Sequence, residues 1–363
     1  MENQKVWQAC GKKLVDRYLI KGLSGMALGL FATLLIGTII KQLGSFFSDL
    51  WIGQMLMMLG KLGTVMTGVG IAVGVAHQLG ASKLVLYSSI INGLVGAYGA
   101  KLAAGVVMIE NDILLSGPGD PLGAFVAAVI GVEIGRLVSG KSKLDILLTP
   151  TVTILSGSIA QYCIGPSLSQ FTTLLSELIK MAMTLQPFFM GIVVSVSMGV
   201  FLTLPISSAA IGVILNLSGI AGGAATAGCC AQMIGFAIMS YRENKINGLI
   251  AQGLGTSMLQ MPNIIKNPKI WLPPILASAI TGPVASVVFK LENIATGSGM
   301  GTSGLVGPLL MWQTMIDKGV SGKMLIVEIL LVCFVLPGIL TWIFAEILRK
   351  MNWIKPSDLK LEL

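Results

Sequence analysis

The chain has 363 residues, of which 54% are hydrophobic and only 11% are charged, and its mean hydropathy is +0.85. Soluble domains carry roughly 25% charged residues, so this chain has too few charges to cover the surface of a soluble protein. The net charge of +8 comes from Lys and Arg scattered over loops, and without a basic face it argues against nucleic-acid binding. We therefore expect an all-α polytopic membrane protein.

About 20 apolar residues are needed for a helix to cross the hydrocarbon core. The first apolar stretch, 22–40, is too long for the apolar region of a signal peptide, so we expect it to remain as the first span. Segment 206–219 is short for a crossing and is alternatively half of a hairpin. The predicted spans are about ten in number: 20–40, 62–79, 84–105, 121–138, 146–164, 186–205, 206–219, 220–241, 271–290 and 324–348.

Basic residues in the loops predict the orientation. They cluster before the first span, after the fourth, after the eighth and after the last, whereas the loop after the third span is acidic. With ten crossings every basic cluster lies on one side, so both termini are expected in the cytoplasm of a bacterial plasma (inner) membrane. The basic residues are Lys5, Lys12, Lys13, Arg17 and Lys21, then Arg136, Lys141 and Lys143, then Arg242, Lys245, Lys266 and Lys269, and finally Arg349, Lys350, Lys355 and Lys360; the acidic ones are Glu110, Asp112 and Asp120.

Segment 166–184 differs from the spans because apolar residues recur at helical spacing while polar residues such as Glu177 and Lys180 occupy the other face. This pattern predicts an amphipathic helix at the membrane interface, and a tilted ordinary span is the alternative. As a connector it would separate an N-terminal block, 1–165, expected to dimerise, from a C-terminal block, 185–363, expected to bind and transport substrate.

Three uncharged or nearly uncharged stretches, 205–228, 248–263 and 292–308, are rich in Gly, Ser, Thr and Asn. Irregular backbone at membrane depth must be buried in protein or line a watery cavity, and transporters use such broken helices to hold a solute. Glycines that only let helices pack closely are the alternative. That alternative suits Gly68, Gly70 and Gly74, but not five glycines between 297 and 307. We therefore expect re-entrant hairpins.

Glu292 begins the third stretch, and a carboxylate at membrane depth usually pairs or binds something polar. It is the leading candidate ligand for a solute, with Lys290 as an alternative partner. Glu133 is expected to pair with Arg136 on one helix face. The sole histidine, His77, has no carboxylate or cysteine at a spacing that suits a triad or a metal site.

The five cysteines, Cys10, Cys163, Cys229, Cys230 and Cys333, form no CxxC or Cys/His pattern. The glycine-rich runs lack the endings of a Walker or Rossmann motif. We therefore expect no metal, no cofactor and no catalytic residue in this chain, and no transport driven by ATP.

Residues 253–264, Asn267-Pro268, 271–274 and 297–308 together resemble the membrane IIC components of the phosphoenolpyruvate-dependent sugar phosphotransferase system. The resemblance extends from Gly22 to about Arg349, and the best match is the standalone branch that includes the perfringolysin O regulator-like proteins. It implies a homodimer formed through the N-terminal spans, with the sugar held by the C-terminal spans and two hairpins.

In sugar-transporting relatives a glutamate beside the second hairpin contacts sugar hydroxyls, and Glu292 matches that position. Relatives also commonly use a histidine in the transport domain, where this sequence has none, since His77 lies in the N-terminal block. The predicted substrate-binding residues are Glu292, Asn293, Gly299, Gly301, Thr302, Gln260, Asn263 and His77.

The predicted function is a transporter subunit that binds a small polar solute, a sugar by resemblance, and moves it by alternating access. The chain has no soluble stretch of domain size, so phosphotransfer would require separate IIA and IIB proteins. The sequence leaves two alternative functions open. One is a membrane sensor or regulator that retains the IIC fold, and the other is a transporter of a non-sugar metabolite without phosphorylation.

The orientation can be tested with single cysteines placed in two loops. We predict that an impermeant thiol reagent added outside the cell labels Leu115→Cys but does not label Lys141→Cys. Labelling of both termini from the external face would contradict the predicted orientation.

Overall fold

The computed structural model describes residues 13–105, 108–109 and 112–361. Lys5, Cys10, Lys12 and Glu110, which figure in the sequence predictions, lie outside the described residues. The chain divides into two compact units, unit 1 up to Gln170 and unit 2 from Phe171 to Glu362. Apart from the two-residue antiparallel strands β1 (Met108–Ile109) and β2 (Asp112–Ile113), its regular elements are helical. The all-α membrane fold is confirmed.

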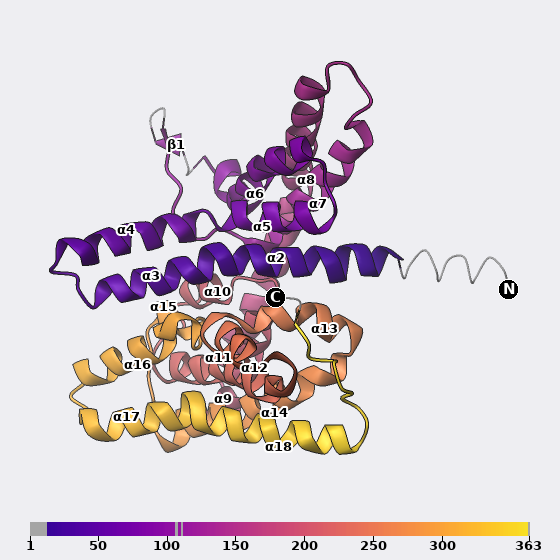
Figure 1. Ribbon diagram of the computed structural model, residues 1–363. Helices are drawn as coiled ribbons and strands as arrows, with labels where there is room; N and C mark the ends of the chain where they lie inside the picture. The colour runs from indigo at the N-terminus through magenta and orange to yellow at the C-terminus, as the bar shows by residue number, and fades with distance from the viewer. Residues whose placement is uncertain (1–12, 106–107, 110–111, 362–363) are drawn as a thin grey trace. The chain divides into compact units, whose positions relative to one another are not determined.

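Unit 1 begins with one long helical rod, Val15–Ser45. Figure 1 shows the end of this rod, α3, running beside α4 as a hairpin. The α4–α5 pair bends by 51° at Met66. The elements of unit 1 are η1 (Val15–Gly22), α2 (Leu23–Leu30), η2 (Phe31–Leu35), α3 (Ile36–Ser45), α4 (Trp51–Val65), α5 (Thr67–Gln78), α6 (Lys83–Ala103), α7 (Pro121–Val138) and the first part of α8 (Asp145–Ala182).

Glycines allow the helices of unit 1 to touch backbone to backbone. A Cβ added to Gly29 of α2 would collide with the carbonyl of Gly70 in α5, and one added to Gly68 would collide with the carbonyl of Gly93 in α6. Small residues at such crossings let helices approach closely in a membrane. The sequence alternative of close packing therefore holds for these glycines of unit 1.

The segment predicted as a separate amphipathic connector continues α8 without a break. This helix has 38 residues and includes both Pro150 and Pro166, so it is about 57 Å long at 1.5 Å per residue. That length is nearly twice the ~30 Å hydrocarbon core. The division between the two units falls within this helix, at 170/171.

Unit 2 surrounds α11, which is buried over most of its length. Helices α9, α14 and α18 pack against it, and Figure 1 shows the α17–α18 rod in yellow along one side of this unit. The elements are α9 (Pro187–Thr203), α10 (Ser208–Ile214), α11 (Gly219–Met239), α12 (Tyr241–Ile250), η3 (Ala251–Gly255), η4 (Ser257–Gln260), α13 (Met261–Lys266), η5 (Pro268–Trp271), α14 (Leu272–Pro283), η6 (Val284–Val288), α15 (Ala295–Ser298), η7 (Ser303–Leu305), α16 (Val306–Asp317), α17 (Gly322–Leu330), η8 (Leu331–Val335) and α18 (Leu336–Lys350).

Gln232 is the polar centre of this packing. Its side-chain oxygen accepts hydrogen bonds from the Trp271 indole at 3.0 Å and the Thr203 hydroxyl at 3.3 Å. Its amide nitrogen donates to the Ser278 hydroxyl at 3.4 Å. Because the amide is fully buried and both ends are hydrogen-bonded, a polar group is tolerated at the core of the helix bundle.

Among the described residues, six helices are long and apolar enough to cross a membrane, or seven if the bent α4–α5 pair counts as one span. Ten crossings therefore remain a prediction. Helices α6 and α9 fall where spans were predicted, but α10 has only seven residues and is about 10 Å long. That length favours the hairpin alternative for 206–219. Helix α4 was not predicted as a separate element.

Two glycine substitutions in unit 2 should differ in their effect on stability. A Cβ at Gly228 would collide with the Ser195 carbonyl, whereas a Cβ at Gly338 would make ordinary contact, 3.5 Å from the Ile238 side chain. Alanine adds roughly 1 kcal/mol of helix propensity, but overpacking costs about 1–3 kcal/mol. We expect Gly228→Ala to lower the thermal unfolding midpoint in mild detergent and Gly338→Ala to leave it equal or higher. An equal loss in both variants would refute the backbone contact at Gly228.

Candidate functional site

The backbone of unit 2 leaves regular helix between η6 and α16. Lys290, Gly301, Gly304 and Leu305 all have positive φ, and α15 within this segment has only four residues. The backbone N–H of Asn293 donates to the carbonyl of Gly219, the first residue of α11, at 3.2 Å. The glycine-rich run thus forms a broken segment against the beginning of the most buried helix.

Glu292 occupies the start of this broken segment. Its Oε2 pairs with the Lys318 Nζ at 2.5 Å, and the two side chains are 24% and 51% exposed. A Cβ added to Gly219 would lie 3.3 Å from that oxygen, so the carboxylate lies beside the first residue of α11, at the positive end of the helix dipole. Among the described residues, none donates a hydrogen bond to Oε1. The site holds a carboxylate that is about a quarter exposed and has one oxygen able to accept further hydrogen bonds.

Lys318, rather than the predicted Lys290, is the partner of Glu292. Lys290 is exposed and takes a left-handed conformation, φ 48°. Lys318 follows the last residue of α16 and is 26 positions further along the chain than Glu292. Helical periodicity relates only residues three or four positions apart, so it could not predict this pair. The sequence indicated only that charged residues are scarce in this apolar chain, so that each one is a candidate for an ion pair.

Asn293 has the opposite character to Glu292, because its side chain is fully buried. Its amide nitrogen donates to the Thr226 hydroxyl at 2.8 Å and the Gly307 carbonyl at 3.0 Å, and its oxygen accepts from the Ile294 amide at 2.8 Å. The side chain ties the broken segment to α11 and α16. In this conformation its hydrogen-bonding groups are engaged within the protein.

The predicted residues Gly299, Gly301 and Thr302 join the broken segments to one another. The Ser208 hydroxyl of α10 donates to the Gly299 carbonyl at 2.7 Å, and Gly301 has φ 53° and packs on Cys229. The Thr302 hydroxyl donates to the Gly253 carbonyl at 2.5 Å. The structure therefore connects all three glycine-rich stretches through hydrogen bonds.

Gln260 and Asn263 lie in a different network, which binds the end of the chain. Gln260 donates to the Gln252 side-chain oxygen at 2.8 Å and to the Leu359 carbonyl at 3.0 Å. Asn263 donates to the Gln260 side-chain oxygen at 2.8 Å and to the Lys360 carbonyl at 2.9 Å. Both side chains are buried. No hydrogen bond between described residues connects either of them to Glu292.

Two further amides hold the same C-terminal segment, 353–361. Asn244 donates to the Leu359 carbonyl at 2.7 Å and accepts from the Leu361 amide at 2.8 Å. Asn267 donates to the Trp353 carbonyl at 2.9 Å. Asn267 also donates to the Asp358 carboxylate at 2.7 Å, but the other tail groups bound by these two side chains are backbone atoms. Backbone atoms carry no sequence pattern, so the network could not be recognised from the sequence.

His77 lies in unit 1, exposed near the end of α5, so it belongs to a different unit from the other predicted ligands. Glu133 pairs with Arg136 at 3.5 Å, three residues along α7 as expected. Its closer partner is Arg17, at 2.6 Å, which also donates to the Leu79 carbonyl. Among the described residues no three His, Cys, Asp or Glu side chains come together as a metal site.

A protein-family model described as "Phosphotransferase system, EIIC" matches residues 20–361 of the chain. No curated protein and no solved structure matches the chain. The family match covers both units.

Removing the Asn244 side chain should release the C-terminal segment. Two neutral hydrogen bonds are worth about 1–3 kcal/mol together, so Asn244→Ala should raise the open population of the tail roughly tenfold. We expect faster cleavage by a lysine-specific protease at Lys355 and Lys360. Gln313→Ala is the control, because it removes only an exposed bond to Asp317. Equal cleavage of Asn244→Ala and the wild type would contradict the restraint of the tail.

Proposed function

The chain belongs to the EIIC family of the phosphotransferase system, and on that premise we propose that unit 2 binds a sugar at Glu292 and carries it across the membrane by alternating access. The family implies a membrane sugar-transport subunit with a sugar substrate and separate IIA and IIB partners. The geometry around Glu292 supports the proposal that the sugar binds at this residue.

The observation that carries the proposal is the position of the Glu292 carboxylate. It lies where η6 has ended and α11 begins, among segments whose backbone is irregular. An ionisable group at such a break in an intramembrane helix is typical of a solute site. Sugar hydroxyls would donate to Oε1, which accepts no hydrogen bond from the described residues.

Lys318 gives the proposed site a neutral total charge. A half-exposed ion pair is worth only about 0–1 kcal/mol, so a solute can rearrange it at little cost. In the proposal the ammonium donates to a sugar oxygen while the carboxylate accepts from a neighbouring hydroxyl. A carboxylate with a matched ammonium favours an uncharged polyol over an anion or a cation.

The remaining predicted residues take supporting positions in this proposal. Asn293, Gly299, Gly301 and Thr302 hold the broken segment in the shape that presents Glu292. Gln260 and Asn263 would reach a solute only after the tail carbonyls leave their amide groups. His77 stays a prediction from the sequence.

The movement and assembly also remain proposals. Unit 1, with its backbone-packed glycine helices, would form the homodimer, and unit 2 would move past it with the solute. The joined glycine-rich segments support movement of unit 2 as one body, because its three breaks are tied to one another.

Replacing Glu292 by Gln removes the charge and keeps the shape. A hydrogen bond to a charged group is worth roughly 1.5–3 kcal/mol, and 1.4 kcal/mol is a factor of ten. We therefore expect Glu292→Gln to weaken binding of the stabilising sugar at least about tenfold, measured by thermal shift over a panel of neutral sugars. Glu177→Gln is the matched control, because that carboxylate is exposed on α8.

The wild type and the control should show the same sugar-dependent rise in unfolding temperature. If Glu292→Gln folds and the sugar stabilises it as strongly as the wild type, Glu292 is not a ligand. Uptake into vesicles supplied with separate IIA and IIB proteins then separates a transporter from a sensor, since a sensor binds the sugar without accumulating it.

A further inference from the structure

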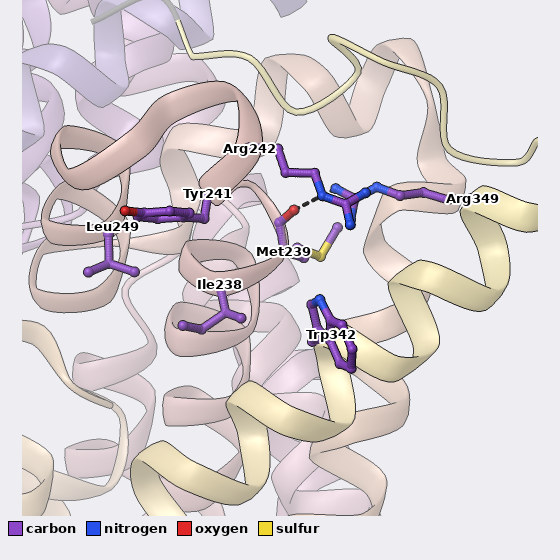
Figure 2. Close-up of a pocket in the computed structure, with 7 residues that line it drawn as sticks. All are labelled: Ile238, Met239, Tyr241, Arg242, Leu249, Trp342 and Arg349. Atoms are coloured by element: carbon purple, nitrogen blue, oxygen red, sulfur yellow. Dashed lines mark hydrogen bonds between the residues drawn. The ribbon is translucent and has the colours of Figure 1, made fainter.

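A pocket outside the proposed sugar site opens at the end of α11 and α18. Its volume is about 370 Å³. Figure 2 shows Ile238 and Leu249 at one side, Trp342 of α18 below, and the two guanidinium groups of Arg242 and Arg349 next to each other above. The pocket is an apolar groove with arginines at one edge.

The groove lies at the ends of two candidate spans, where a membrane helix passes from the hydrocarbon to the headgroups. Two candidate spans finish here, α11 at Met239 and the α17–α18 rod at Lys350. Trp342 is seven residues before Arg349, a rise of about 10 Å along the helix. The groove therefore extends from the charged end of the span about 10 Å towards the membrane interior, and Trp and Tyr side chains are favoured at that depth.

The two arginines have different roles. Arg349 is only 15% exposed and is bound by Glu346 at 2.7 Å and by the Met239 carbonyl at 2.6 Å. It also faces Glu243 at 3.9 Å. Arg242 is 63% exposed and touches only one carboxylate in the described chain, Glu346 at 3.1 Å. Because a guanidinium has five N–H donors, Arg242 retains donors for another anion.

The two chain segments that contribute the arginines carry an excess of basic residues. Segments 241–269 and 346–361 contain eight Lys and Arg and only three Asp and Glu. The two segments are in contact, because Asn244 and Gln260 bind the tail and the Lys269 ammonium lies 4.7 Å from the Trp353 ring. Burial also raises the pKa of Glu243, which makes it a weaker acid than an exposed glutamate. The excess of positive charge complements an anion.

We propose that this groove binds an anionic phospholipid, with an acyl chain against Ile238, Leu249 and Trp342 and the phosphate on Arg242. Basic pockets at the ends of membrane helices are suited to acidic headgroups. The apolar wall distinguishes a lipid from a soluble phosphate, which would need no groove of this kind. The proposal is independent of the sugar site.

The test compares lipids that differ in headgroup alone. Delipidated protein in mild detergent receives phosphatidylglycerol, phosphatidylcholine with the same acyl chains, or inorganic phosphate, and native mass spectrometry and thermal unfolding report binding. We expect retained phosphatidylglycerol and a higher unfolding temperature, a smaller effect of phosphatidylcholine, and no effect of inorganic phosphate. Equal effects of the two lipids, or the full effect from phosphate alone, would overturn the proposal.

Two variants assign the binding to this groove. Arg242→Gln should weaken phosphatidylglycerol binding about tenfold, as expected for loss of a charge-assisted contact, while Arg242→Lys should retain most of it. Lys323→Gln is the control, an exposed cation at the other end of the α17–α18 rod. Unchanged lipid selectivity in folded Arg242→Gln refutes the site. If Arg242→Gln does not fold, Trp342→Ala tests the site instead. The proposal then requires that Trp342→Ala weakens phosphatidylglycerol binding and that Lys323→Gln does not.

Discussion

Lipid cannot form hydrogen bonds with a backbone amide or carbonyl, so every break in an intramembrane helix must find partners inside the protein. Unit 2 interrupts its helices before α11, between α12 and α13, and between η6 and α16. The broken segments form hydrogen bonds with one another. The backbone N–H of Asn293 donates to the Gly219 carbonyl, and the Thr302 hydroxyl donates to the Gly253 carbonyl. This mutual hydrogen bonding makes three distant stretches of sequence one structural element.

The same constraint explains the composition of α11 and the position of Glu292. A helix enclosed by broken segments needs small side chains, and Gly222 and Gly223 lie directly against the carbonyls of Asn293 and Leu291. A larger residue there would separate the segments from the helix and leave their polar groups unpaired. Glu292 stands at the end of this contact, and among the described residues none donates a hydrogen bond to its Oε1.

Composition was sufficient to predict an all-α membrane protein, and glycine content located its breaks, because both are local properties of the sequence. Glu292 could be singled out because an isolated carboxylate is rare in so apolar a chain. Lys318 could not be assigned as its partner, since an ion pair across 26 residues depends on the fold. The tail network was equally hidden, because most of the tail groups that it binds are backbone atoms. For α8, amphipathic periodicity correctly indicated helix but could not show that the helix continues through Pro166.

We propose that a sugar binds in unit 2 where the broken segment meets the start of α11. Hydrogen exchange of the protein in lipid nanodiscs, with and without a sugar that stabilises it, measures this directly. We expect saturating sugar to slow the exchange of backbone amides at 216–222 and 290–305. Slowed exchange confined to unit 1, with these two segments unchanged, would contradict it.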